Sequence, residues 1–297
     1  MLLRSFLAAL TFLTLVPAGG SRMFTQREIS VSRGFYPLVG LLIGLLLVAL
    51  ERGASQLFSQ PPAGWASLSA GSLLNPAPLT GSLLNPAPLT GAVLLLALLV
   101  ITRGLHFDGF MDVCDGLFGG YTRERRLEIM RDSHVGSFAV AGGTALLILK
   151  YGALLSLLSY SGAGKLWVLL AFPMLSRWSM VILLQAFPYV REAGLGSPFH
   201  GEGRKPWIAA GFALLVTAGV SIALGGIGGA AIMIGVSLLA VLLGWTMTRI
   251  LGGLTGDIYG ATNELAEVTV LIAAVALLPY GLIQPYWLLW SLAGLFW

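Results

Sequence analysis

The stretch that decides the fold is residues 103–138, RGLHFDGFMDVCDGLFGGYTRERRLEIMRDSHVGSF. Only 10% of the chain is charged and 57% is hydrophobic, yet six of the 13 Asp and Glu residues lie in this segment. Three of them, Asp108, Asp112 and Asp115, follow the spacing i, i+4, i+7. On a helix, which turns by about 100° per residue, their carboxylates fall within about 60° of one another. The segment therefore predicts a helix with a stripe of carboxylates on one face.

Such a stripe predicts a metal site. Three anions on one face repel one another unless a cation lies between them. Carboxylate oxygens suit hard divalent ions, Mg²⁺ or Mn²⁺, better than they suit zinc or copper. We therefore expect Asp108, Asp112 and Asp115 to bind Mg²⁺, with Mn²⁺ as the alternative. The single cysteine, Cys114, excludes an intramolecular disulfide and a two-cysteine metal site.

The composition of the rest of the chain is typical of a membrane protein. The mean hydropathy is +0.87, and runs of Leu, Ala, Val and Gly fill most of the 297 residues. The net charge of +4 is small and no basic run alternates with aromatic residues, so we expect no nucleic-acid partner. The composition predicts an all-α, polytopic bundle that is embedded in membrane lipids.

Apolar runs predict about seven membrane-spanning helices in a single domain, residues 1–297. The runs lie at 35–50, 91–107, 136–158, 166–187, 207–224, 227–248 and 266–283, with a short apolar tail at 284–297. Residues 1–18 carry one charge, on Arg4, which favours an N-terminal interfacial helix over a cleaved signal peptide.

The second of these runs is too short to cross a membrane as a plain apolar helix. Its apolar part, residues 91–102, rises by only about 18 Å, whereas the hydrocarbon core is about 30 Å thick. We expect this helix to continue through His106 and Asp108, which places ionisable groups at membrane depth. Such groups normally face a cavity and are functional.

Charged and nearly uncharged connecting segments alternate along the chain. The charged ones are 22–33, 103–132, 191–205 and 249–267, and the nearly uncharged ones are 51–90, 159–165 and 225–226. With seven spans every charged segment falls on one side, which the positive-inside rule identifies as the cytoplasm. We therefore expect a multi-pass protein of the bacterial cytoplasmic (inner) membrane, with an active-site segment at 103–135 on its cytoplasmic side.

Residues 51–90 are expected to form an external loop. They contain the decapeptide GSLLNPAPLT twice, at 71–80 and 81–90. Its proline pairs and Asn-Pro steps disfavour a continuous helix and favour an extended loop. We interpret the repeat as a duplicated loop without a function of its own.

A second polar cluster lies at 249–267 and predicts a second active-site segment. Asp257 and Glu264 are spaced i, i+7 and share a helical face. Gly260 and Ala261 between them keep that face small, so another helix or a ligand can approach closely. We expect Asp257 and Glu264 to complete the metal site, and we interpret Glu267 as stabilising a helix dipole.

Basic residues beside these carboxylates indicate a substrate rich in phosphate, because arginine forks match phosphate oxygens. The residues expected to contact substrate are Arg103, Arg126, Arg131, Arg177 and Asn263. Lipid headgroups are the alternative ligands of Arg126 and Arg131, and an acidic neighbour is the alternative partner of Arg177. Lys150 lies near the end of a predicted span, where its side chain can reach the membrane surface.

Three motifs in this order resemble the cobalamin synthase family, the adenosylcobinamide-GDP ribazoletransferases. The motifs are HxDGxxDxxDG at 106–116, RLEIMRDSxVG at 126–136 and GLTGDxxGAxxE at 253–264. Residues 36–40, YPLVG, also resemble the usual start of the first span in that family. Arg131 stands where the family pattern has lysine, and Phe107, Phe110 and Cys114 replace smaller or aliphatic residues. These departures keep the charge pattern and affect the shape of the pocket.

The resemblance implies the last joining step of coenzyme B12 assembly, catalysed by a phosphotransferase for substituted phosphate groups. The 3′-hydroxyl of α-ribazole, or of its 5′-phosphate, would attack the cobinamide-linked phosphorus of adenosylcobinamide-GDP, and GMP would leave. Carboxylate-bound divalent ions neutralise the pyrophosphate in such a displacement. The expected metal ligands are Asp108, Asp112, Asp115, Asp257 and Glu264.

The proton acceptor in this scheme is expected to be Asp115 or Asp257. His106 is the alternative acceptor, but it lies about 200° from Asp108 around the helix, which favours a supporting role. Candidate partners are other enzymes of nucleotide-loop assembly and further copies of this chain.

Two other functions stay open from the residues alone. One is a lipid enzyme that resembles CDP-alcohol phosphotransferases, and the other is an ion- or proton-coupled transporter. The acids cluster at one membrane level with arginines beside them, whereas a conduction path would spread them through the membrane depth. This clustering favours an enzyme.

Overall fold

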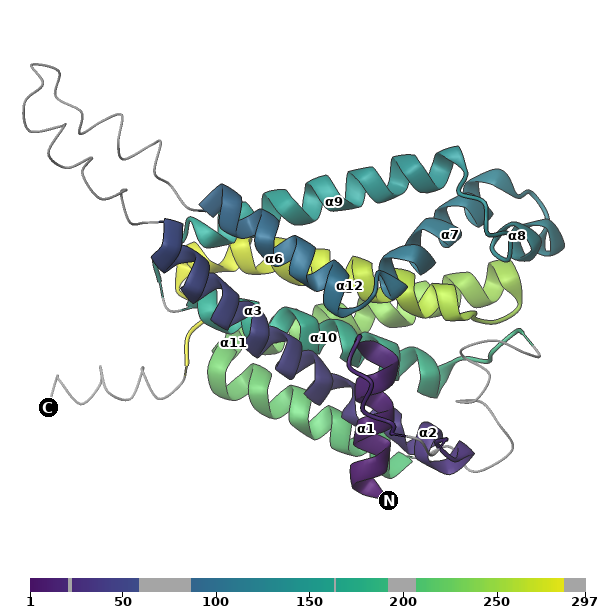
Figure 1. The fold of residues 1–297 in the computed structure, drawn as a ribbon, viewed down its shortest axis with the longest axis horizontal. Coiled ribbons are helices and arrows are strands. Elements are labelled where there is room, and N and C mark those ends of the chain that lie inside the picture. Colours follow the sequence, from purple (N-terminus) through teal and green to yellow (C-terminus); the bar gives the residue numbers. More distant parts are fainter. Residues whose placement is uncertain (21–22, 59–86, 163, 192–206, 286–297) are drawn as a thin grey trace, which may run out of the picture.

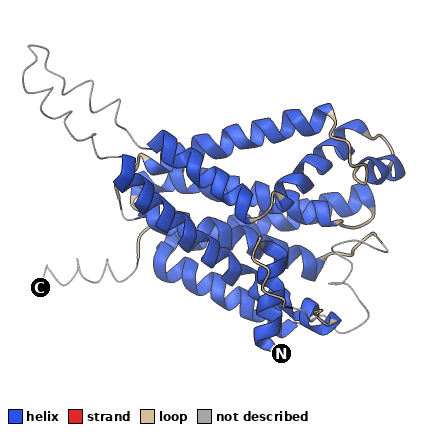
Figure 2. Cartoon of the chain, viewed as in Figure 1, coloured by secondary structure: helices blue, strands red, loops and turns tan. Residues whose placement is uncertain are grey.

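The protein is all-helical in the computed structural model, which describes residues 1–20, 23–58, 87–162, 164–191 and 207–285 (Figures 1 and 2). No named strand occurs within these ranges. The elements are α1 (Leu2–Leu13), α2 (Gln26–Ser32), η1 (Arg33–Phe35), α3 (Tyr36–Phe58), α6 (Ala87–Ile101), α7 (Leu105–Gly119), α8 (Arg123–Ile129), α9 (Ser137–Leu158), α10 (Gly164–Ala186), α11 (Trp207–Leu251), α12 (Gly256–Leu277) and η3 (Leu278–Tyr280).

The described helices include five that are long and apolar enough to cross a membrane. These are the stretch Gln26–Leu57, α9, α10, α11 and the stretch Gly256–Tyr280. The bent pair of α6 and α7 becomes a sixth if the two helices together make one span. The predicted polytopic membrane bundle is confirmed.

The 45-residue α11 covers two predicted spans, 207–224 and 227–248. Gly226 interrupts it with φ 61° and ψ −145°, a conformation that suits glycine. In an unbroken helix residues 221 and 229 would lie about 12 Å apart along the axis. Here a side chain at Gly229 would meet the carbonyl oxygen of Ser221, so the helix bends sharply. Both ends of α11 lie toward the end of the molecule that holds α2 and α8 (Figure 1).

The expectation of one continuous helix through His106 and Asp108 is wrong. α6 ends at Ile101 and α7 begins at Leu105, with an angle of 87° between them. Arg103 (φ 55°) and Gly104 (φ 64°) are both left-handed, which ends an α-helix. The carboxylate stripe therefore lies on a helix of its own, turned away from the preceding apolar one.

The predicted external loop at 51–90 is too long at both ends. Residues 51–58 continue α3, and residues 87–90 form the first turn of α6. Pro88 is tolerated there because the first turn of a helix needs no N–H donor at that position. Residues 59–86, with most of the duplicated decapeptide, and most of the tail at 284–297 lie outside the described residues.

The N-terminal segment predicted at 1–18 contains the helix α1. Ser5, Ala8, Ala9 and Leu13 on one face of α1 are buried, while Leu2 and Leu3 are exposed. The helix packs against α2 and α3 (Figure 1). Its small buried residues let it lie close to the bundle.

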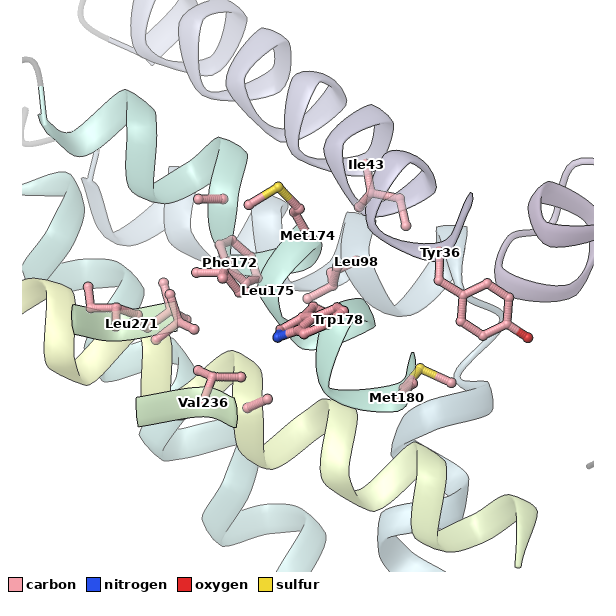
Figure 3. Close-up of a cluster of buried hydrophobic side chains, with 14 of the residues drawn as sticks. Tyr36, Ile43, Leu98, Phe172, Met174, Leu175, Trp178, Met180, Val236 and Leu271 are labelled. Carbon is pink, nitrogen blue, oxygen red and sulfur yellow. The ribbon is translucent and has the colours of Figure 1, made fainter. Parts of the chain in front are cut away.

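The core is centred on α10, which packs against α3, α11 and α12. Figure 3 shows Phe172, Leu175 and Trp178 of α10 among side chains of the neighbouring helices. Side chains at Gly40 and Gly44 of α3 would meet the α10 backbone at Pro173 and Leu170. Small residues one helical turn apart are what allows two membrane helices to approach so closely. This packing gives a rigid support for the helices that carry the polar residues.

Candidate active site

Helices α7 and α12 cross in backbone contact at two glycines. A Cβ atom at Gly109 would lie 2.9 Å from Cα of Asp257, and one at Gly260 would lie 3.1 Å from Cα of His106. Glycine at both positions allows this approach, since any larger side chain would separate the helices. The crossing brings Asp257 of the second polar segment next to the carboxylate stripe of the first, as predicted.

A cavity of about 110 Å³ lies at this crossing. Its polar lining consists of Tyr36, His106, Asp108, Tyr189, Arg191, Asp257 and Tyr259. Phe12, Leu105, Met180 and Leu184 add an apolar wall. A small cavity with a few converging polar groups in an apolar surround is the usual form of a binding site.

Two carboxylates that line this cavity, those of Asp108 and Asp257, interact with a third on α7, that of Asp112. Asp112 interacts electrostatically with Asp257 and Asp108, and more weakly with Asp115. Arg191 provides a compensating positive charge, with Nη2 2.7 Å from Oδ2 of Asp257. The same Asp257 oxygen accepts a hydrogen bond from the Thr255 hydroxyl at 3.2 Å.

Arg191 was not singled out by the sequence, which marked it only as the start of the charged segment 191–205. Its position follows from main-chain pairing, because the Val190 N–H donates to the Leu254 carbonyl at 2.9 Å and the Leu254 N–H to the Pro188 carbonyl at 2.8 Å. This pairing fastens the chain after α10 to the start of α12. No sequence signal joins residues 66 positions apart in this way.

Asp115 does not face the other carboxylates as a free ligand. Its Oδ2 accepts the Gly136 N–H at 2.6 Å and its Oδ1 accepts the Ala139 N–H at 2.8 Å. It therefore caps the N-terminus of α9, where backbone N–H groups lack helical partners and favour an anion. Asp115 thus has a structural contact that the sequence did not indicate, and its role as a metal ligand or proton acceptor stays a prediction.

Glu264 lies in a different place from the one predicted. It is buried inside the bundle and pairs with Lys150, whose Nζ also lies 2.8 Å from Glu267. Arg177 pairs with Glu267 from the other side, and Asn263 donates to Glu267 at 3.2 Å. Glu264 does not line the cavity with Asp108 and Asp257, and its role as a ligand shared with the aspartate stripe stays a prediction.

The same network decides the positions of three other predicted residues. Arg177 is fully buried and has its acidic neighbour in Glu267, which was the alternative to substrate contact. Asn263 is fully buried as well and does not line the cavity. Lys150 is only 1% exposed, so the expectation that it reaches the membrane surface is wrong. Glu267 is the centre of a buried ion network rather than a simple helix-dipole residue.

His106 lies at the floor of the cavity and is 1% exposed. Neither of its ring nitrogens has a hydrogen-bond partner among the described residues. The helical angle separated it from Asp108, yet both residues line the same cavity because α12 crosses between them. It is thus a buried polar group, without a hydrogen-bond partner among the described residues, in the wall of the cavity.

The predicted phosphate-binding arginines lie around the cavity rather than in it. Arg103 is exposed at the turn between α6 and α7 and donates to the Thr11 carbonyl at 3.3 Å. Arg126 of α8 donates from Nε to the Gly120 carbonyl at 2.8 Å, and Arg131 is exposed just after α8. Met130, which lies between Arg126 and Arg131 in the sequence, is linked to the site through Arg191. Its carbonyl accepts a hydrogen bond from Arg191 at 3.2 Å.

An exposed ion pair closes the turn between α8 and α9. The Nδ1 atom of His134 lies 2.6 Å from Oδ1 of Asp132. This hydrogen bond raises the pKa of the His134 imidazole and lowers the pKa of the Asp132 carboxyl group. The pair shapes the turn that leads into the α9 cap at Gly136.

The remaining oxygen donors have the chemistry that a hard divalent ion requires. Asp108, Asp112 and Asp257 are carboxylates that interact with one another, and only Arg191 among the described residues compensates them at close range. No group of three His, Cys, Asp or Glu side chains in the described part of the chain is arranged closely enough to hold an ion as it stands. The donor set fits Mg²⁺ in kind, although its side chains would have to move to coordinate one ion.

The fold and the cavity define the class of this protein: a multi-pass helical membrane protein with a carboxylate-bearing site where two helices cross. A family model described as Cobalamin-5-phosphate synthase matches residues 5–77 and 65–275. The chain therefore belongs to the cobalamin-5-phosphate synthase family, and the resemblance of its three motifs is confirmed.

Relatives agree with this assignment. The chain is 38% identical to an adenosylcobinamide-GDP ribazoletransferase of Desulfitobacterium hafniense, over 93% of this chain and 98% of the relative. It is 37% identical to proteins of the same name from Roseiflexus sp. and Geotalea daltonii, over 93% of this chain and 90% and 98% of those relatives. No solved structure matches the chain.

Proposed function

We propose that this chain is an adenosylcobinamide-GDP ribazoletransferase with its reaction centre in the cavity between α7 and α12. The observation that carries the proposal is the convergence of Asp108 and Asp257, from two separate family motifs, on one cavity that Arg191 also lines. The 3′-hydroxyl oxygen of α-ribazole, or of its 5′-phosphate, forms a bond to the cobinamide-linked phosphorus. The bond from that phosphorus to the oxygen bridging to the guanylate breaks, and GMP leaves.

Asp108, Asp112 and Asp257 are the residues that would hold Mg²⁺. When bound there, the ion would neutralise the diphosphate and stabilise the charge that develops on the leaving group. Asp115 and Glu264 take no part in this step, since the first caps α9 and the second is paired with Lys150. Arg126 and Arg131 lie close in sequence to Met130, whose carbonyl contacts the cavity residue Arg191, and they would attract the phosphates of the incoming substrate.

His106 takes the proton of the attacking hydroxyl in this proposal. Its ring nitrogens are unpartnered among the described residues, whereas Asp257 is paired with Arg191 and Asp115 with the α9 backbone. Around His106, the Glu267 carboxylate favours a positive charge on the ring, whereas the Arg177 and Lys150 cations disfavour it. The buried ion network supports the floor of the site without touching substrate.

The orientation predicted from charge is part of the proposal: the cavity opens to the cytoplasm of a bacterial inner membrane. No specific observation favours the alternative functions, a lipid enzyme or a transporter. The match to the cobalamin-5-phosphate synthase family covers both polar segments, and its relatives are named transferases.

The test is release of GMP by the purified protein from adenosylcobinamide-GDP and α-ribazole, with and without Mg²⁺. We expect Mg²⁺-dependent release, and a loss of about 100-fold or more in Asp257→Asn and Asp108→Asn, the size found when one charge-stabilising group is removed. Asp132→Asn is the matched control, because it makes the same chemical change on the exposed turn outside the cavity. GMP release at the wild-type rate by Asp257→Asn would contradict the proposal.

A further inference from the structure

Arg191 joins three parts of the molecule at the edge of the cavity. It follows α10, its Nη2 atom lies 2.7 Å from Oδ2 of Asp257 at the start of α12, and the same atom donates to the Met130 carbonyl at the end of α8 at 3.2 Å. The side chain is 12% exposed. Its Nε atom is buried and has no hydrogen-bond partner among the described residues. Among the described residues its hydrogen bonds come from Nη2 alone, although a guanidinium offers five N–H donors.

The charges around Arg191 do not balance. Asp108, Asp112 and Asp257 bring three carboxylates together, and a single guanidinium compensates them. The deficit matches the charge of one divalent cation. A cation bound to Asp257 would share this carboxylate with the guanidinium, which already contacts its Oδ2 atom, and the two positive charges would repel each other.

We propose, building on the ribazoletransferase function above, that Arg191 is an exchangeable partner of Asp257. It pairs with Asp257 in the absence of a divalent cation, and it turns to the phosphates of the bound diphosphate ester when a cation occupies Asp257. Binding of the cation and binding of the phosphates are then coupled, because the first releases the guanidinium that the second requires. Arginine suits this task, since its fork can contact either a carboxylate or a phosphate with little change of geometry.

Two features of the site allow the exchange. The contact of Arg191 with the Met130 carbonyl is a single hydrogen bond, so the head group can leave Asp257 and stay anchored nearby. Arg191 also lines the cavity together with Asp108 and His106, so its guanidinium has open space to turn into. A purely structural arginine would instead use most of its donors, as the buried Arg33 does with the Ser30 and Leu184 carbonyls and the Gln185 side chain.

The test measures binding of Mn²⁺ to the detergent-purified protein by electron paramagnetic resonance, without any substrate. If Arg191 competes with the cation, Arg191→Gln binds Mn²⁺ more tightly than the wild type, by about 10-fold to 100-fold, the range expected when a hydrogen bond to a charged group no longer has to be broken. Mn²⁺ binding by Arg191→Gln that is unchanged or weaker would overturn the proposal, because the guanidinium would then be neutral toward the cation or required for its site.

Arg125→Gln is the matched control. Arg125 is an exposed arginine that pairs with Glu128 on the surface of α8, at 2.8 Å, so its loss should leave Mn²⁺ affinity within about twofold of the wild type. If Arg191→Gln does not fold, Arg191→Lys carries the test. A lysine keeps the charge but makes a weaker single contact, so the proposal requires Mn²⁺ affinity to rise severalfold, and unchanged affinity would overturn it.

The second readout is binding of GDP in the presence of saturating Mn²⁺. The proposal requires Arg191→Gln to bind GDP about 10-fold more weakly than the wild type or worse, although it binds the cation more tightly. Equal GDP affinity would overturn the coupling. These binding measurements involve no turnover. A failure to release GMP from adenosylcobinamide-GDP would reject the proposed function, but the Mn²⁺ measurement would still test whether Arg191 competes with the cation.

Discussion

Residues of one chemical type on one helical face have different roles in this protein. Asp108 and Asp112 interact electrostatically with Asp257, whereas Asp115, one turn further along α7, has both oxygens on the backbone of α9. The periodicity of the stripe predicted three equivalent ligands. The start of α9 determines the contacts of Asp115, because the Gly136 and Ala139 N–H groups donate to its two oxygens.

This difference predicts separate effects of substitution. Asp115→Ala removes a helix cap, so we expect a loss of about 0.5–2 kcal/mol of stability, seen as a lower midpoint of thermal unfolding in detergent. Its Mn²⁺ affinity should stay close to that of the wild type. Asp108→Ala should show the reverse, with weaker Mn²⁺ binding and little change in the midpoint. If Asp115→Ala lost Mn²⁺ binding while its thermal unfolding midpoint stayed unchanged, Asp115 would be a metal ligand rather than a helix cap.

At the scale of elements, the backbone contact between α7 and α12 determines the geometry of the cavity. Gly109 lies against Asp257 and Gly260 against His106, so each glycine of one helix touches a cavity-lining residue of the other. The relative position of the carboxylates therefore depends on having glycine, which has no side chain, at both of these positions.

We expect Gly109→Ala to reduce GMP release strongly. The new Cβ atom would lie 2.9 Å from both Cα and the carbonyl oxygen of Asp257, and backbone atoms cannot move aside cheaply. Overpacking of this kind costs about 1–3 kcal/mol and moves the helices apart. Gly235→Ala in α11 is the control, since nothing lies within 4 Å of its Cβ position. The explanation fails if both alanine variants have the same activity and thermal midpoint.

A second contact between elements is the buried ion network. Lys150 of α9 is held between Glu264 and Glu267 of α12, and Arg177 of α10 completes the charge balance. Two carboxylates and two cations are thus neutral together inside the bundle. This balance makes each partner essential, because an unpaired charge in a dry interior is costly.

Lys150→Met should therefore destabilise the protein by about 3–5 kcal/mol, as expected when one partner of a buried pair is removed. Adding Glu264→Gln should restore part of the loss, because the second change removes the carboxylate that the first left unpaired. Thermal unfolding of the single and double variants in detergent measures both effects. A double variant less stable than Lys150→Met would show that Glu264 has another essential contact.

At the scale of the whole molecule, the polar residues of the site gather toward one end of the helical bundle. Figure 1 shows α7, α8 and the start of α12 there, with η3 and the end of α12 toward the opposite end. Because the chain turns back at Gly226, both ends of α11 lie near the site. The arrangement is the one that the alternation of charged and uncharged segments predicts.

This topology predicts how the chain lies in the membrane. In a Cys114→Ser background, a cysteine at Tyr121 near the site should react with a membrane-impermeant thiol reagent only in inverted vesicles. A cysteine in place of Tyr280 in η3 should react in whole cells whose outer membrane has been permeabilised. Both side chains are well exposed, at 92% and 78%, so lack of reaction would not follow from burial. The reverse pattern would place the cavity on the outer side.

The sequence by itself determined the membrane class, most of the helices, the family and the two polar segments, since each depends on composition, periodicity or motifs that are local to the chain. Only the tertiary structure decided that α6 and α7 are separate helices, that Asp115 caps α9, that Glu264 and Arg177 belong to a buried network and that Arg191 reaches Asp257. The physical reason is that a carboxylate has the same local pattern whether it binds a cation, a helix end or a lysine. Which of these it meets depends on the helix that packs against it, and that packing is a property of the folded chain.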